Sequence, residues 1–144
     1  MRRLVAILLI LCLVAPVRPA SQAVVLVVRA DSPVKELDSV SRRKLFLGLP
    51  VLVNGSPLRP LHNRSDALLN EIFLQQIVAM SESNYERQIL NGVNRQGWLR
   101  PTELSRVGDV TAALMADPNA VSFMWERDVG HNPQIRVLGV VWSD

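Results

Sequence analysis

Residues 23–28 read Ala-Val-Val-Leu-Val-Val, a continuous apolar run that is rich in β-branched side chains. A run without polar alternation is typical of a strand that is buried on both faces of a sheet. Asp31, Ser32 and Pro33 follow and end the strand, since this cluster is typical of a turn. The segment therefore predicts a strand inside a sheet whose two faces are both covered.

Helices and strands are expected to alternate along the rest of the chain. Apolar residues at helical spacing predict four helices, of which the second is the longest: residues 39–47, 66–80, 83–93 and 107–117. Strand patterns predict a hairpin at 51–61 and two later strands: residues 120–125 and 135–142. The chain from Gly92 to Pro101 is expected to form a loop. Interleaved strands and helices indicate an α/β domain around a mostly buried sheet.

Local residue choices set the expected ends of these elements. Asp38 or Ser39 can cap the first helix, because each has a side-chain oxygen that accepts from free backbone N–H groups. Asn-Gly at 54–55 predicts a type I′ turn, which needs positive φ at both positions. Ser83 with Glu86 has the spacing of a capping box for the third helix.

The first 23 residues have the three parts of a secretory signal peptide. Residues 1–3 are a short positive region, residues 4–15 are twelve apolar residues, and residues 21–23 supply small side chains for cleavage. A membrane anchor is the alternative, but a spanning helix needs about 20 apolar residues. We therefore expect residues 1–23 to be a cleaved signal peptide and residues 24–144 to be one exported domain.

The charge of the sequence is concentrated in that N-terminal region. The formal net charge of +3 comes from Arg2, Arg3 and Arg18, and residues 24–144 contain thirteen basic and thirteen acidic residues. Non-specific nucleic-acid binding needs a surplus of positive charge, so this class is not expected. Cys12 is the only cysteine and also lies in this region. The expected domain therefore forms no disulfide and no cysteine metal site, which suits a bacterial periplasm.

The sequence contains no arrangement that indicates an enzyme. His62 and His131 are far apart, neither has a metal-ligand neighbour four residues later, and both are expected on loops. No serine lies in Gly-x-Ser-x-Gly. Residues 92–97 have the glycine spacing of a P-loop but lead into Trp98 in place of Lys-Ser/Thr, so a turn is expected there. We expect no catalytic residue, no metal and no cofactor.

The best candidate for a ligand site is Asn63, Arg64, Ser65 and Asp66. Here a strand leads into a helix N-terminus, where free N–H groups and the positive end of the dipole attract anions. Arg64 can add a bidentate guanidinium. Asp66 has two interpretations: it can cap the helix, where its exposed charge would repel an anion, or, when buried, it can accept a hydrogen bond from a protonated oxyanion such as hydrogen phosphate. Plain capping and ligand binding both stay open on the residues alone.

A basic cluster at Arg42, Arg43 and Lys44 lies in the last turns of the first predicted helix. Cations there suit the negative end of the helix dipole, so a solvated helix face is one interpretation. The other is a docking surface for an acidic partner.

Several motifs, in this order, resemble the phosphate-binding-protein-like family, the periplasmic solute-binding proteins of ABC phosphate transporters and their short relatives. Residues 24–33, 41–48 and 53–55 resemble the family's first strand, its helix ending in Ile-Phe-Leu-Gly-Lys and its Trp-Asn hairpin. Residues 64–66, followed by Phe73, match the Arg-Ser-Asp that precedes its ligand helix. Residues 118–123 are a loosened form of its Pro-Gly-x-Ile-Gly-Tyr. The resemblance covers nearly all of residues 24–144.

The resemblance implies an α/β fold made of a single lobe of the type 2 periplasmic-binding-protein-like fold, with a mixed central sheet flanked by helices. Full-length members have two lobes, and residues 24–144 supply about one, similar to the second. The family follows Arg-Ser-Asp with Gly-Ser-Gly-Thr, which wraps phosphate, whereas residues 67–70 here are Ala-Leu-Leu-Asn. Of the usual ligand residues of that lobe only Arg64 clearly carries over, and the hairpin tryptophan is lost near Leu52.

The function implied by this resemblance is that of a periplasmic, non-enzymatic protein that binds or senses inorganic phosphate or another small oxyanion. The expected ligand residues are Arg64, Ser65, Asp66 and Asn63. The alternative is a degenerate lobe that acts as a protein–protein interaction module, docking on a membrane sensor or transporter through Arg42 and Arg43.

Overall fold

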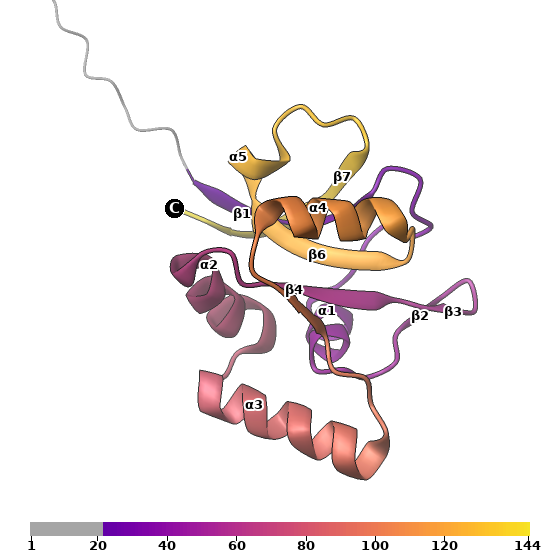
Figure 1. Cartoon of the computed structure of the whole chain (residues 1–144), viewed down its shortest axis with the longest axis vertical. Helices are drawn as coiled ribbons and strands as arrows, with labels where there is room; N and C mark the ends of the chain where they lie inside the picture. The colour runs from indigo at the N-terminus through magenta and orange to yellow at the C-terminus, as the bar shows by residue number, and fades with distance from the viewer. Residues whose placement is uncertain (1–21) are drawn as a thin grey trace, which may run out of the picture.

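The computed structural model describes residues 22–144 (Figure 1). Nearly all of the expected signal peptide, residues 1–23, lies outside the described residues. Ala23, the last residue of that expected segment, begins the first strand of the fold.

A five-stranded mixed sheet forms the centre of the molecule, in the order β5-β4-β6-β1-β7. Its strands are β1 (Ala23–Arg29), β4 (Arg59–Asn63), β5 (Thr102–Leu104), β6 (Ala120–Trp125) and β7 (Ile135–Ser143). β1 pairs antiparallel with β6 and β7, while β4 pairs parallel with β5 and β6. The predicted α/β class with a mixed sheet is confirmed, and β1 is buried along residues 24–28 as its sequence predicts.

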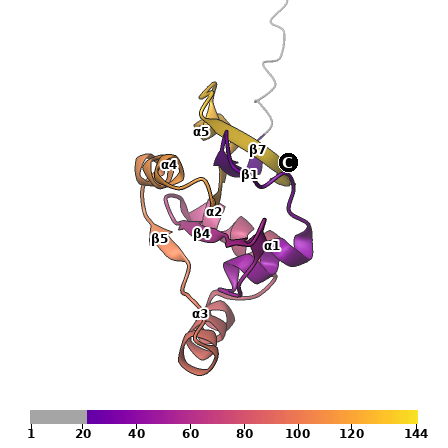
Figure 2. The same cartoon turned by 90° about the vertical axis from the view of Figure 1, so that its right-hand side faces the viewer.

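Side chains of β1 alternate between two hydrophobic cores, one on each face of the sheet. Val24, Leu26 and Val28 pack with the aromatic side chains of one core, and Val25 and Val27 pack in the other. Figure 2 shows α4 (Val107–Ala116) and α1 (Ser39–Phe46) on opposite sides of the sheet. The buried side chains of α2 (Ala67–Ile72) pack in the same core as those of α1. The continuous apolar run of β1 therefore follows from burial on both faces.

The helical segments begin and end mostly where capping chemistry places them. Asp38 caps α1 by accepting from the Ser41 N–H at 2.8 Å, as predicted. α2 continues as the π-helix η1 (Phe73–Val78), and α3 (Glu82–Asn91) continues as a second π-helix, η2 (Gly92–Gln96). A short helix, α5 (Glu126–Val129), follows β6 and was not expected from the sequence. In residues 22–144 no helix combines the length and the apolar character needed to span a bilayer.

Three predictions about the second and third helices are wrong. Ser81, not Ser83 with Glu86, caps α3 by accepting from the Asn84 N–H. Gly92–Gln96 is helical rather than loop, so the longest helical segment is residues 82–96 instead of the second helix. Trp98 folds back on the start of this extension: its N–H donates to the Gly92 carbonyl at 3.1 Å, and its indole ring lies where a Cβ of residue 92 would be.

The predicted hairpin is correct at its turn but too long. β2 (Leu52–Val53) pairs with β3 (Ser56–Pro57) through Asn54 and Gly55, which both have positive φ. After Leu58 the chain leaves the hairpin, and the Arg59 N–H donates to the Asn119 carbonyl at 2.9 Å. Residues 59–61 therefore belong to β4 of the main sheet, and the candidate site lies at the end of this strand.

Candidate functional site

The end of β4 is held in place by a buried asparagine. Asn63 is fully buried; its Nδ2 donates to the Phe123 carbonyl at 3.0 Å, and its Oδ1 accepts from the Ser65 N–H at 3.1 Å. One side chain thus joins β4 to β6 and shapes the turn that leads to α2. Both polar atoms of Asn63 already have partners, so its role in the structure is to position the residues that follow.

Asp66 and Ser65 occupy the turn between β4 and α2. The Asp66 carboxylate accepts from the Leu69 N–H at 3.0 Å and is the N-cap of α2, which is the capping interpretation of this residue. The Ser65 hydroxyl is buried and has no hydrogen-bond partner in the described part of the chain. An unpartnered buried hydroxyl costs about 1–3 kcal/mol, so a group that bonds to it would be stabilising.

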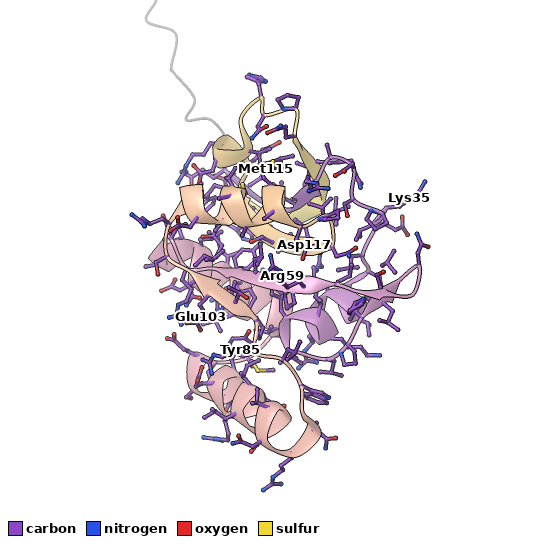
Figure 3. All side chains as sticks on the ribbon, turned by 45° about the vertical axis from the view of Figure 1, so that its right-hand side comes forward. Lys35, Arg59, Tyr85, Glu103, Met115 and Asp117 are labelled. Carbon is purple, nitrogen blue, oxygen red and sulfur yellow. The ribbon has the colours of Figure 1, made fainter. Side chains whose placement is uncertain are left out.

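Arg64 projects from the same turn into a cluster of charged side chains. Its Nη2 lies 2.8 Å from Glu82 Oε1, its Nη1 lies 3.5 Å from Glu103 Oε1, and 37% of its side chain is exposed. Glu103 also lies 3.6 Å from Arg100, which pairs with Glu86 at 2.7 Å. Figure 3 shows Glu103 above α3, on the side of the molecule where β5 forms the sheet edge. The guanidinium therefore already contacts carboxylates from α3 and β5.

The charge balance of this cluster is negative. Three carboxylates, from Glu82, Glu86 and Glu103, surround two guanidinium groups, from Arg64 and Arg100. The hydrogen bond from Arg100 to Glu86 raises the pKa of that guanidinium. The two contacts of Arg64 use two of its five N–H donors, so an incoming anion either binds the remaining donors beside these carboxylates or displaces one of them.

His62 lies in β4 directly before the site, so the prediction that it lies on a loop is wrong. Its ring is buried against Phe73, with centroids 4.1 Å apart, and Nε2 is 2.9 Å from Asn70 Oδ1. Burial lowers its pKa, and Nδ1 has no partner among the described residues. The burial of His62 was not predictable from the sequence, because the residues around it do not alternate between apolar and polar as they do in a typical strand. His131, in contrast, lies on a turn as predicted.

Hydrophobic side chains replace the small residues that would form a tight loop around an anion. Leu69 is fully buried in the core, whereas Leu68 is 49% exposed. Residues 22–144 contain no cluster of three His, Cys, Asp or Glu side chains that could hold a metal ion. The site therefore offers as donors Arg64, the Ser65 hydroxyl and those first-turn N–H groups of α2 that Asp66 does not occupy.

The predicted docking residues lie on another element, α1. Arg43 Nε donates to the Val78 carbonyl at 2.9 Å and so ties α1 to the end of η1. Arg42 Nε is buried without a partner in the described chain, and this burial lowers the pKa of its guanidinium. The structure thus brings Asn63, Arg64, Ser65 and Asp66 together at one turn and places Arg42 and Arg43 outside it.

No protein-family model matches the sequence, and no curated protein matches it. Solved structures do match. A protein described as a phosphate ABC transporter substrate-binding protein with bound phosphate, from Clostridium perfringens, has a TM-score of 0.60 at 13% identity and covers 82% of this chain. An ABC-type phosphate transport receptor from Vibrio cholerae has a TM-score of 0.58 at 10% identity, also over 82% of this chain. PstS from Borrelia burgdorferi has a TM-score of 0.59 at 8% identity over 83%.

The chain spans less than half the length of these proteins, namely 44%, 46% and 47% of the three. Identities of this size establish the fold alone. The resemblance found in the sequence and the likeness in structure agree on the same group of proteins, although the sequence motifs are short. The chain therefore has a periplasmic-binding-protein-type fold, with the extent of a single lobe.

Proposed function

We propose that this protein is an exported, non-enzymatic binding domain that takes a small oxyanion, with inorganic phosphate as the first candidate, at the turn between β4 and α2. The observation that carries the proposal is the buried, unpartnered Ser65 hydroxyl beside Arg64. A tetrahedral oxyanion offers several acceptor oxygens, so it can bond to both groups and to the free N–H groups of the first turn of α2.

The solved structures support an oxyanion as the ligand. The solved neighbours are phosphate-transport binding proteins, and one of them contains bound phosphate. Their fold is that of solute-binding proteins, which agrees with a non-enzymatic role. The proposal includes export by a signal peptide at residues 1–23 and a periplasmic location. Both rest on the sequence, because the residues before Gln22 lie outside the described structure.

The carboxylates of Glu82 and Glu103 set the expected affinity. Exposed ion pairs contribute about 0.2–1 kcal/mol each, so an anion can displace them, but this cost lowers its affinity. The Arg64 and Glu82 side chains are also 37% and 61% exposed, so water screens the electrostatic interactions of the site. We expect weak binding, with a dissociation constant of about 0.1–1 mM, which corresponds to about 4–5.5 kcal/mol.

Thermal unfolding of the purified protein with added phosphate tests this proposal. For a dissociation constant of about 1 mM, 10 mM phosphate would add roughly 1.4 kcal/mol, a shift of a few degrees for a domain of this size. Arg64→Ala should remove the shift, and Ser65→Ala should reduce it. Arg106→Ala is the matched control, because Arg106 is an exposed cation that pairs with Asp109 outside the site. An equal phosphate shift in Arg64→Ala and Arg106→Ala would contradict the proposal.

The ion pairs of Arg64 favour a second candidate function, a degenerate lobe that has become a protein–protein interaction module for a membrane sensor or transporter. In that case Glu82 and Glu103 hold the guanidinium permanently. No phosphate, sulfate or other oxyanion would then shift unfolding at millimolar concentration and matched ionic strength. The same titration therefore separates the two functions.

A further inference from the structure

A shallow groove of about 360 Å³ lies between α1 and the end of η1. Val40, Leu47 and Ile77 form its apolar part, and Arg43 and Lys44 stand along it. Val40, Arg43, Lys44 and Leu47 are spaced at i, i+3, i+4 and i+7, so they lie on one face of the helix and its C-cap. The groove thus combines apolar residues at both ends of a helix face with two cations between them.

The cations of this face lack acidic partners. The ion pairs in residues 22–144 use Arg29, Arg59, Arg64, Arg100 and Arg106, but none includes Arg42, Arg43 or Lys44. No carboxylate lines the groove. The nearest acid in sequence, Asp38, is occupied in capping α1. Five of the thirteen described Lys and Arg side chains form ion pairs, and the three neighbouring cations of α1 are all among the eight that do not, so this face has positive charge available for a partner.

Apolar exposure points to the same surface. The Val40 side chain is 61% exposed at the rim of the groove, next to a cation one helical turn later. A volume of about 360 Å³ holds one or two side chains, which suits a short segment better than a whole helix. Arg43 is fixed by its bond to the Val78 carbonyl, so one of the two cations is already oriented before a partner arrives.

We propose that the α1–η1 groove docks a short acidic segment of a partner protein, with one apolar side chain seated between Val40 and Ile77 and carboxylates on Arg43 and Lys44. Charge complementarity sets the orientation, and the apolar contact adds affinity. This inference deepens the interaction-module candidate above. It concerns a different element from the oxyanion site, so either can fail without the other.

The test uses fluorescence anisotropy with labelled synthetic peptides and the purified protein. The probe set is eight-residue peptides of Glu and Asp with one leucine, placed at each position in turn. Two matched peptides replace the leucine by serine, or the acids by Gln and Asn. We expect saturable binding of at least one acidic leucine peptide, at least tenfold tighter than either matched peptide, and weakened by salt.

Variants locate the binding. Lys44→Glu should weaken binding at least tenfold, and Val40→Ser about fivefold; both side chains are exposed, so the fold should be retained. Arg95→Glu is the control, because it changes the net charge as much as Lys44→Glu does but at an exposed residue of η2, outside the groove. It should change binding less than twofold. Arg64→Ala should also leave peptide binding unchanged, which separates this result from failure of the oxyanion site.

Three results would overturn the inference. One is the absence of saturable binding for every acidic leucine peptide up to 1 mM. A second is an equal loss of binding in Lys44→Glu and Arg95→Glu, which would indicate non-specific charge attraction. The third is binding to vesicles of phosphatidylglycerol that depends on Lys44 while no peptide binds, which would make this face a membrane-surface site instead.

Discussion

Replacing Glu82 by glutamine should strengthen the binding of phosphate at Arg64. The Glu82 carboxylate lies 2.8 Å from Arg64 Nη2 and is 61% exposed, so it competes directly with an incoming anion. Glutamine keeps the size of the side chain and removes its charge. The variant therefore frees the guanidinium without creating a cavity.

The size of the effect follows from two contributions. Breaking an exposed ion pair costs about 0.2–1 kcal/mol, and the variant removes that cost. Repulsion between a carboxylate and an anion about 5 Å away in water contributes roughly 0.8 kcal/mol per unit charge, and it also disappears. Together these give about 1–1.8 kcal/mol, or roughly a five- to twentyfold gain in affinity. Glu82 is in the first turn of α3, so its loss lowers fold stability by only a few tenths of a kcal/mol.

Isothermal titration calorimetry with phosphate at fixed ionic strength measures this gain. Glu36→Gln is the control, because Glu36 is an exposed carboxylate before α1 and the net charge changes equally. Adding Glu103→Gln to Glu82→Gln should strengthen binding further. If Glu82→Gln binds phosphate no better than Glu36→Gln, then Arg64 does not receive the anion and the reasoning is refuted.

Three predictions concern the scaffold around the site. Because burial lowers the pKa of His62, stability should be full above its ordinary pKa of about 6.5 and fall as the pH drops from 7 to 5; His62→Phe should flatten this slope in chemical unfolding, and an unchanged slope would contradict the prediction. Phe73→Ala should cost about 3–5 kcal/mol in urea unfolding, because Phe73 is fully buried, and a cost below 1 kcal/mol would contradict this packing. Gly48→Ala should lower the melting temperature by several degrees, because φ is +88° and a Cβ would lie 2.6 Å from the Leu99 carbonyl oxygen; an unchanged value would count against this contact.

Elements with strong local patterns were predictable from the sequence. The run at 23–28 has no polar interruption, and only a strand between two cores accommodates it. The helix ending before Gly48 and the Asn-Gly turn were predictable because positive φ restricts the residue type. In each case one or two neighbouring residues determine the backbone, so no long-range contact is needed.

Elements that depend on distant contacts were missed. β5 has only three residues, two of them exposed, and it exists because β4 offers a parallel edge. The helical extension at Gly92–Gln96 depends on Trp98 folding back onto Gly92. The burial of His62 depends on Phe73 in η1. None of these contacts has a pattern with a fixed period, which explains their absence from the predictions.

At the candidate site, too, features set by neighbouring residues were predictable, whereas contacts with distant residues were not. The turn at residues 63–66 was predictable, since a strand that leads into a capped helix places its side chains within a few residues of one another. The partners of Arg64 were not, because Glu82 and Glu103 are 18 and 39 residues away and come from α3 and β5. Local sequence therefore locates the guanidinium, whereas the arrangement of α3 and β5 determines whether it is free for an anion. The ion pairs of Glu82 and Glu103 with Arg64 are exposed and therefore weak, so an anion can replace them. The affinity for an anion at residues 63–66 therefore depends on these two carboxylates, which lie outside that segment.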